Sequence, residues 1–293
     1  AAKKPVYPSV KSLSVSQNRL NEKKLFADLK IPSARFAEIR SEADLHGAAK
    51  TLGLPLVIKT VTMGYDGKGQ FLLHSEDQIP QAWSALGAQT PLMAEEFMHF
   101  KRELSIIAVR SRDGKTACYP LTENVHHRGI LSHSIAPAPF VENDIQLTAE
   151  RYISTILHEL DHVGAITLEM FETHNGIFAN ETAPRVHNSG HWTIEGARCS
   201  QFENHVRAVA GLPLGDTTCD RPTAMLNIIS LHPKTEDILQ IKDVHLHLYG
   251  KDEREGRKLG HITLTANNHH ELAAGITQVA DLLPNPMAIF PGK

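Results

Sequence analysis

Short apolar runs alternate with amphipathic segments along this chain, which predicts a mixture of strands and helices. The clearest helical pattern extends from about Glu142 to Leu160, where Ile145, Ala149, Ile153 and Ile156 recur at helical spacing. One face of this helix is therefore expected to pack in a core.

The same patterns predict the other elements. Helices are expected at about 16–29, 41–52, 77–86, 197–210 and 269–283, and strands at about 54–60, 69–73, 92–97, 101–110, 116–121, 164–173, 177–181, 224–229, 244–249 and 261–265. Ser41 is the expected N-cap of its helix. Arg19 and Lys23 are open to interpretation as the solvated face of the first helix.

Grouping these elements predicts an α+β protein with two lobes and a smaller companion, for which 293 residues are sufficient. Residues 1–15 are rich in Lys, Pro and Ser without periodicity and predict a linker-like leader. A helix plus a small lobe is expected at 16–98, a large lobe at 99–215 and a C-terminal α/β subdomain, mostly β, at 216–293.

Composition narrows the class of protein. Apolar residues make up 41% and charged residues 22%, which is ordinary for a globular protein. The formal charge of -3 argues against a nucleic-acid partner, and no apolar run is long enough for a membrane helix. Three scattered cysteines without a CxxC pair fit a reducing compartment, so a cytosolic protein is expected. The 18 histidines do not complete a spaced zinc motif.

Candidate chemistry is concentrated in residues 180–192. This stretch, Asn180-Glu181-Thr182-Ala183-Pro184-Arg185-Val186-His187-Asn188-Ser189-Gly190-His191-Trp192, holds a carboxylate, a guanidinium, two imidazoles and two amides. A solvated loop would also be polar, but it rarely carries His, Arg and Trp at this density. The stretch therefore predicts a functional site.

The two apolar runs on either side of His174-Asn175-Gly176 predict a β-hairpin that leads into this site. A three-residue loop at 174–176, closed by a left-handed Gly176, pairs Thr173 with Ile177 and puts Glu169 directly opposite Glu181. A two-residue Asn-Gly turn would instead put the two carboxylates on opposite faces.

The register decides the chemistry of the two glutamates. Facing carboxylates destabilise a ladder unless a cation lies between them. With the neighbouring Asn180 oxygen, the pair Glu169 and Glu181 would suit magnesium that also holds phosphate oxygens. The alternative is that one glutamate simply faces solvent on an edge strand.

Two further segments are compatible with phosphate binding. Lys59 ends an apolar strand, where burial is costly unless an anion meets it, and Gly64, Gly67 and Gly69 follow in a loop whose backbone N–H groups are able to cradle phosphate. A glycine-rich turn without a ligand explains that loop equally well. Residues 251–258 form a basic-leaning segment for which a solvated turn is the default.

Four ordered motifs resemble one family. Gly64-Tyr65-Asp66-Gly67-Lys68-Gly69-Gln70, the segment Ala183 to Trp192, Ser200-Gln201-Phe202-Glu203 and Gly256-Arg257-Lys258-Leu259-Gly260-His261 are similar to the 5-(carboxyamino)imidazole ribonucleotide synthetases of purine biosynthesis. The resemblance covers nearly the whole chain. It implies an ATP-grasp fold, in which two α+β lobes hold ATP, and the ATP-dependent carboxylation of aminoimidazole ribonucleotide by bicarbonate through carboxyphosphate. It also implies a homodimer.

The resemblance also implies roles for individual residues. The ATP site would comprise Arg19, Lys59, Gly64, Gly67, Gly69, Gln70, Glu95, Glu96, Phe97, Met98, Glu103 and Asn180. Within it, Arg19 and Lys59 would meet phosphates, residues 95–98 would hold adenine and Glu103 the ribose. The magnesium ligands would be Glu169 and Glu181. The catalytic residues would be Tyr65, Asp66, Arg185, His187 and Asn188, the last three on the acyl phosphate. The ribonucleotide would be held by Tyr65, Asp66, Lys251, Arg257 and Lys258, which replaces the solvated-turn interpretation.

Two departures from the family pattern leave alternatives open. Glu255 occupies a position where proline is usual, which adds a negative charge near the proposed phosphate. The N-terminal domain with a Gly-Gln-Leu-Gly motif, usual ahead of the helix at Ser16, is absent from this sequence, so poor ribonucleotide binding and an exposed docking patch are expected unless a longer chain supplies it. Another ATP-grasp ligase with a different acceptor, or a non-catalytic nucleotide-binding remnant, are the competing functions.

Overall fold

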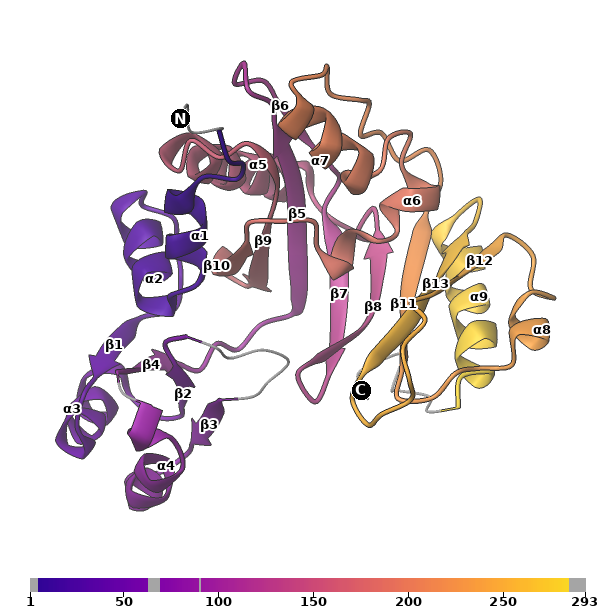
Figure 1. Cartoon of the computed structure of the whole chain (residues 1–293). Coiled ribbons are helices and arrows are strands. Elements are labelled where there is room, and N and C mark those ends of the chain that lie inside the picture. The colour runs from indigo at the N-terminus through magenta and orange to yellow at the C-terminus, as the bar shows by residue number, and fades with distance from the viewer. Residues whose placement is uncertain (1–4, 63–68, 90, 285–293) are drawn as a thin grey trace.

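The structure, a computed structural model, describes residues 5–62, 69–89 and 91–284. It shows a small lobe beside a larger body (Figure 1). The helices of the described residues are α1 Val10–Ser16, α2 Arg19–Asp28, α3 Glu42–Leu52, α4 Ile79–Leu86, α5 Asn143–Glu159, α6 Thr193–Gly196, α7 Gln201–Ala210, α8 Thr235–Ile238 and α9 His269–Asp281. Short 3-10 helices are η1 Glu76–Gln78, η2 Gly87–Gln89 and η3 Asn188–Gly190.

The small lobe is built on a four-stranded antiparallel sheet in the order β1-β4-β2-β3. Its strands are β1 Phe36–Ile39, β4 Leu92–Glu96, β2 Leu56–Thr60 and β3 Gln70–Leu73. Because side chains alternate along a strand, Leu56 and Ile58 are buried in the same cluster as residues of α3 and α4, while Val57 and Lys59 point the other way. That second face looks toward the large lobe.

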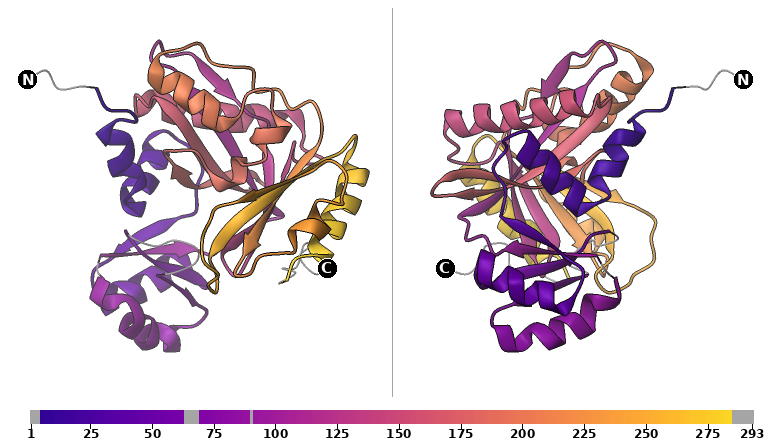
Figure 2. Two further views of the ribbon diagram at one scale, coloured as in Figure 1. Left: turned by 45° about the vertical axis from the view of Figure 1, so that its right-hand side comes forward. Right: turned by 90° about the vertical axis from the view of Figure 1, so that its left-hand side faces the viewer.

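One continuous sheet runs through the rest of the molecule in the order β10-β9-β5-β7-β8-β11-β13-β12, with β6 added beside β5. The strands are β5 Arg102–Arg110, β6 Thr116–Cys118, β7 Thr122–His127, β8 Ile130–Ala136, β9 Gly164–Thr173, β10 Gly176–Ala183, β11 Thr223–Ile229, β12 Val244–Leu248 and β13 Lys258–Thr265. Two turned views show α5 and α7 on opposite faces of this sheet (Figure 2).

Alternation along the central strand β5 builds two cores. Leu104, Ile106 and Ala108 pack in one cluster with α5 and α2, whereas Ile107 and Val109 pack in another, with α7 and the side chain of Trp192. Glu103 and Ser105 share the α7-side face, ahead of its apolar part. The sheet therefore offers a polar surface at the end of β5 that faces the small lobe.

Most of the predicted elements are confirmed. The helix over 142–160 is α5, whose Ala149, Ile153 and Ile156 are buried as expected. Ser41 is the N-cap of α3, and it forms a capping box with Asp44. Strands β1, β7 and β8 were not predicted.

The structure corrects two interpretations of the N-terminal part. Residues 10–15, assigned to a linker, belong to helix α1 (Val10–Ser16), whose N-cap is Ser9. Lys23, considered as part of a solvated face, is buried because its ammonium group pairs with the Glu95 carboxylate. The predicted domain limits remain a proposal. Helix α2, assigned with the small lobe, packs against the large sheet, and that sheet continues through β11 into the predicted C-terminal subdomain.

The hairpin of β9 and β10 reaches the predicted pairing by a different route. The turn consists of His174 and Asn175, so Thr173 pairs with Gly176 and not with Ile177. A β-bulge between Ala179 and Glu181 then inserts one extra residue, and Glu181 pairs directly with Glu169. The facing carboxylates are confirmed, but the three-residue loop is wrong.

Among the described residues, no helix is long and apolar enough to cross a membrane.

Candidate functional site

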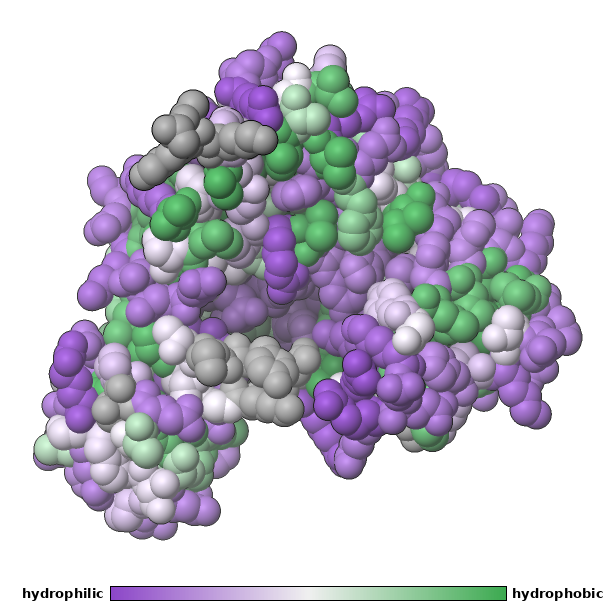
Figure 3. Space-filling view, viewed as in Figure 1, coloured by the Kyte–Doolittle hydropathy of each residue, from purple (hydrophilic) through white to green (hydrophobic). Residues whose placement is uncertain are grey.

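A cleft of about 880 Å³ lies between the small lobe and the polar face of the large sheet. The space-filling view shows a hollow at this position with mainly hydrophilic residues around it (Figure 3). It is lined by both sheets, by α1 and α2, and by the segment that follows β10. Elements distant in sequence thus meet around one cavity.

Most of the described residues predicted for the site line this cleft. They are Arg19, Lys59, Gln70, Glu95, Glu96, Phe97, Met98, Glu103, Glu169, Asn180, Glu181, Arg185, His187, Asn188 and Lys258. Lys251, Arg257 and Gly69 are described but are not among the lining residues. Gly64, Tyr65, Asp66 and Gly67 lie outside the described residues, so their roles stay predictions.

The centre of the cleft is the carboxylate pair at the end of the hairpin. Glu169 Oε1 lies 3.1 Å from His187 Nε2, and Glu181 Oε2 lies 3.8 Å from Arg19 Nη1. Burial would raise the pKa of Glu169, but the hydrogen bond from His187 and the neighbouring positive charges together outweigh burial and lower that pKa. Desolvation in the cleft, followed by the charge of Glu169, raises the pKa of Glu181. The pair is therefore short of positive charge.

This deficit of positive charge fits magnesium. The donors that the hairpin supplies are two carboxylates and the nearby Asn180, all of them oxygen ligands of the kind that Mg²⁺ prefers. Over the described ranges, no group of three or more His, Cys, Asp or Glu forms a metal site by itself. Magnesium commonly takes one or two carboxylates from the protein and its remaining ligands from phosphates and water.

A directed chain of buried hydrogen bonds ends on His187. Ser134 Oγ donates to Asn124 Oδ1 at 2.7 Å, Asn124 Nδ2 donates to Ser105 Oγ at 2.9 Å, and Ser105 Oγ donates to Ser189 Oγ at 2.9 Å. Ser189 Oγ is 2.9 Å from His187 Nδ1, and its own hydrogen remains to be donated there. His187 then carries its proton on Nε2, which faces Glu169.

Lys59 and Glu95 line the cleft on the side of the small lobe, and Lys23 of α2 pairs with the same Glu95 carboxylate. Lys23 Nζ and Lys59 Nζ each lie 2.5 Å from a Glu95 carboxylate oxygen. Burial would raise the pKa of Glu95, but the two ammonium groups outweigh it and lower that pKa to about 2. Glu95 is thus the anion that was expected beside Lys59. Lys59 also lines the cleft, where its ammonium group would contact a bound phosphate.

The other residues of segment 95–98, which is predicted to hold adenine, differ in whether their side chains are already bonded within the protein. Glu96 accepts hydrogen bonds from the backbone and guanidinium of Arg35 at 2.8 and 2.7 Å, so its carboxylate is committed. Phe97 is partly exposed beside it. Across the cleft, Phe100 stacks on Phe171 with ring centroids 4.6 Å apart. These rings provide an apolar wall for a planar base.

Several lining residues were missed by the sequence analysis. His126 Nδ1 lies 2.6 Å from Glu103 Oε2. Burial would lower the pKa of His126, but this contact and the charges of Glu103 and Glu169 together outweigh burial and raise that pKa. Glu22, Phe100 and Phe171 also line the cleft. Only the strand register brings His126 beside Glu103, and the polar run around it gave no periodic signal.

The segment after β10 is held in place by amide side chains. Gln201 accepts from the His187 backbone N–H at 2.9 Å and donates to the His187 carbonyl at 2.7 Å. Asn188 and Asn227 form a reciprocal amide pair at 3.0 and 2.8 Å. Arg185 is exposed and, among the residues that the structure describes, donates locally to the Val186 carbonyl at 2.9 Å. Arg185 is therefore placed to meet an anion in the cleft.

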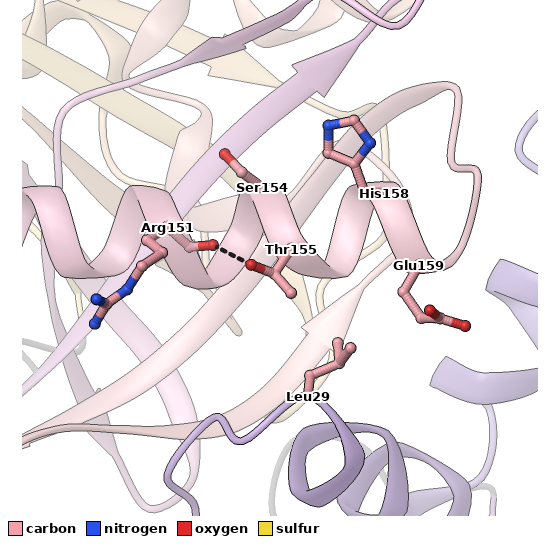
Figure 4. A pocket seen from close by; sticks show the side chains of 6 residues that line it. All are labelled: Leu29, Arg151, Ser154, Thr155, His158 and Glu159. Carbon is pink, nitrogen blue, oxygen red and sulfur yellow. Dashed lines mark hydrogen bonds between the residues drawn. The ribbon is translucent and has the colours of Figure 1, made fainter.

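A second hollow, of about 480 Å³, lies between the end of α2 and helix α5. The close-up shows that its labelled side chains do not converge on a common point (Figure 4). The one interaction drawn there is a helical bond from Thr155 Oγ1 to the Arg151 carbonyl. The hollow therefore lacks the convergent polar groups of a ligand site.

Comparisons with known proteins agree with this geometry. The ATP-grasp domain family model matches residues 24–202, and the phosphoribosylaminoimidazole carboxylase C-terminal domain model matches residues 223–275. The N5-carboxyaminoimidazole ribonucleotide synthase of Pseudomonas aeruginosa is 49% identical over 279 residues, which cover 95% of this chain and 76% of that protein.

Solved structures give the same result. The crystal structure of the Thermus thermophilus N5-carboxyaminoimidazole ribonucleotide synthetase has a TM-score of 0.92 and 44% identity, covering 99% of this chain and 77% of that one. The Aspergillus clavatus N5-carboxyaminoimidazole synthase, in complex with ADP and 5-aminoimidazole ribonucleotide, has a TM-score of 0.90 and 35% identity, covering 97% and 78%.

Proposed function

The chain belongs to the N5-carboxyaminoimidazole ribonucleotide synthase family of ATP-grasp enzymes, and from this membership we infer that it carboxylates 5-aminoimidazole ribonucleotide with ATP and bicarbonate. The products are N5-carboxyaminoimidazole ribonucleotide, ADP and phosphate, and the reaction belongs to purine biosynthesis. The predicted ATP-grasp fold, with its strand-rich C-terminal subdomain, is confirmed.

The observation that carries the assignment of the site is the facing pair Glu169 and Glu181 in a cleft that also holds Lys59, Arg19 and Arg185. Phosphoryl transfer requires little covalent help from a protein, and it depends on neutralising charge around the transferred group. Bound magnesium would supply positive charge for that neutralisation. Glu169 and Glu181 would hold it.

The protein's own cations would position the two halves of the reaction. Arg19 and Lys59 lie on the α2 and small-lobe side of the cleft, where they would hold ATP phosphates, with the base against the apolar wall of Phe97, Phe100 and Phe171. Arg185 and His187 lie beyond the carboxylate pair and would orient bicarbonate and the carboxyphosphate formed from it. The Nε2 proton of His187 stays on the Glu169 side.

Water must be kept from carboxyphosphate, which hydrolyses readily. The cleft lies between two separate lobes, an arrangement that suits closure over bound substrates. Lys258 lines the cleft and would hold the ribonucleotide phosphate, and Lys251 and Arg257 would approach it only from outside the lining. A homodimer and a cytoplasmic location are further proposals, based on the family.

The test is ATP turnover with each substrate left out in turn. ADP release is expected to require magnesium and bicarbonate and to rise with 5-aminoimidazole ribonucleotide, with the carboxylated nucleotide formed in equal amount to ADP. Glu181→Gln removes one charge of the pair at nearly constant volume, so turnover is expected to fall by at least 100-fold with the fold intact. Turnover that ignores the ribonucleotide would favour a different acceptor, and unchanged turnover in Glu181→Gln would remove the role of the pair.

A further inference from the structure

Two ionisable side chains on α2 are buried against the edge of β10. Glu22 and Lys23 are each only 2% exposed, although neither belongs to the ATP or metal assignments above. Buried charges are costly unless they are paired or hydrogen-bonded. Their partners therefore indicate what they hold in place.

Those partners are backbone groups of the β-bulge. Glu22 Oε1 accepts from the Thr182 backbone N–H at 2.6 Å and from the Thr182 hydroxyl at 2.5 Å. Lys23 Nζ donates to the Asn180 carbonyl at 3.0 Å. Three residues before Thr182 on β10, the Ala179 N–H donates to the Pro32 carbonyl at 2.7 Å.

The spacing of these contacts is specific to the bulged strand. In a regular strand, the backbone groups that face one edge recur at every second residue. The N–H groups of Ala179 and Thr182 both face the outer edge of β10 but are an odd number of positions apart, which needs the one extra residue that the bulge supplies. Glu22 thus fits only the register in which Glu181 faces Glu169.

We propose that Glu22 and Lys23 are positioning residues for the magnesium site, because they hold β10 in the bulged register that brings Glu181 opposite Glu169. This inference rests on the proposed function only for the identity of the ion. Without the hydrogen bonds from α2, the edge of β10 is free to relax toward a regular ladder, in which Glu181 would turn to the other face.

Lys23 extends the same arrangement to the small lobe. Its ammonium group contacts the Asn180 carbonyl in the large lobe and the Glu95 carboxylate in β4. One buried side chain thereby touches both the hairpin of the metal pair and the strand that begins the adenine hinge. Lys23 therefore joins the two halves of the ATP site.

Glu22 is the more specific residue to test because, within the described part of the chain, its hydrogen bonds both go to Thr182 of β10. Burial, followed by the charge of Glu181, raises the pKa of Glu22 to about 8, so the neutral Glu22→Gln variant is a close mimic at pH 7. Its amide oxygen still accepts from Thr182. Glu22→Leu keeps the volume but removes the acceptor, and Lys24→Leu changes an exposed residue of the same helix as the control.

The experiment measures ATP binding by calorimetry with and without magnesium, and amide exchange of Thr182 by NMR in the metal-free protein. Glu22→Leu is expected to exchange the Thr182 amide at least tenfold faster and to weaken magnesium-dependent ATP binding at least tenfold. Magnesium-free ATP binding should change less than threefold. Glu22→Gln and Lys24→Leu should stay within threefold of the parent protein in every measurement.

Equal losses in Glu22→Gln and Glu22→Leu, or magnesium-dependent binding unchanged in Glu22→Leu, would overturn the proposal. If Glu22→Leu does not fold, Glu22→Asp takes its place with the same expectations, because the shorter side chain withdraws the acceptor from Thr182. The measurements use neither bicarbonate nor the ribonucleotide. Failure of this proposal is therefore distinguishable from failure of the proposed reaction.

Discussion

At the scale of single residues, the site depends on the direction of hydrogen bonds as much as on charge. The chain from Ser134 to Ser189 leaves His187 Nδ1 as an acceptor and Nε2 as the donor toward Glu169. A hydrogen bond on one ring nitrogen sets the tautomer of a histidine. His187 therefore reaches Glu169 in one defined orientation without needing a charge.

The first residue-scale prediction removes the last hydroxyl of this chain. Ser189→Ala leaves the Ser105 hydroxyl without its acceptor, so the free energy of unfolding should fall by about 1–3 kcal/mol. The catalytic rate kcat should also fall, by at least tenfold, because His187 Nδ1 loses the Ser189 hydroxyl and keeps only the longer bond from the Ser189 backbone N–H at 3.3 Å. The KM for ATP should change less than threefold.

The matched control is Ser134→Ala, which breaks one bond at the far end of the same chain. It should lower the free energy of unfolding by a comparable amount with kcat within threefold of the parent enzyme. Denaturant unfolding and steady-state kinetics measure both quantities. Equal kcat losses in the two variants would show that the chain only stabilises the fold.

At the scale of elements, the start of β13 decides which basic residue enters the cleft. A register shift between Ile228 and Ile229 pairs Ile229 with Lys258, and Lys258 lines the cleft while Arg257 does not. Neighbours in sequence thus occupy different surroundings. They provide a matched pair for testing where the ribonucleotide phosphate binds.

Lys258→Ala is expected to weaken 5-aminoimidazole ribonucleotide binding by 10- to 100-fold, since a charge-assisted hydrogen bond contributes about 1.5–3 kcal/mol. ATP binding should change much less, and Arg257→Ala should have the smaller effect on the ribonucleotide. Calorimetric titration of each variant with each ligand measures these values. Equal losses for both ligands would contradict the placement of the phosphate at Lys258.

Elements with strong periodicity were predictable, whereas β7 and β8 of the large sheet were not. α5 and α3 have an apolar stripe and a capping box that depend on local sequence alone. β7 and β8 carry Asn124, His126 and Ser134 on their cleft side, and these polar residues interrupt the apolar alternation that a buried strand shows. The polar residues of β7 and β8 therefore hid the alternation by which strands are predicted.

The hairpin shows the same limit for register. The pairing of Glu169 with Glu181 was predicted from a three-residue loop that the structure does not have, and the bulge restores the pairing that the shorter turn would have removed. The bulge was not predictable, since its partners Glu22 and Lys23 lie on a helix far away in the sequence. The burial of Lys23 likewise requires Glu95, which only the tertiary structure brings to it.

At the scale of the whole molecule, four buried histidines make stability sensitive to acid. Burial lowers the pKa of His133, His162 and His191 to about 4 and that of His261 to about 3, from an ordinary value of 6.5. They are spread over both faces of the large sheet and the C-terminal strands. The folded protein therefore resists protonating them, whereas the unfolded chain does not.

The sign of the effect follows from proton binding. Between pH 6.5 and about 4 the unfolded chain holds more protons on these imidazoles than the folded protein does, so the free energy of unfolding falls as the pH falls. Glu22, with its pKa raised to about 8, acts in the opposite direction between about pH 8 and 4.5, and so does Glu181 with its raised pKa. Near pH 5, the four lowered imidazole pKa values outweigh the raised pKa values of the two carboxyl groups, so unfolding takes up protons.

We therefore expect the denaturant midpoint to fall progressively from pH 6.5 to pH 4.5, and to change little between pH 6.5 and 7.5. In His162→Gln, the slope of the free energy of unfolding against pH should decrease by the contribution of about one proton. The reason is that His162 is fully buried between Ser12 and the Ala165 carbonyl. His245→Gln, at an exposed position of β12, should leave the slope unchanged. Comparing slopes and not absolute midpoints removes the packing cost of each substitution. A denaturant midpoint that rises as the pH falls would mean that the carboxyl groups, and not the imidazoles, dominate the pH dependence of stability.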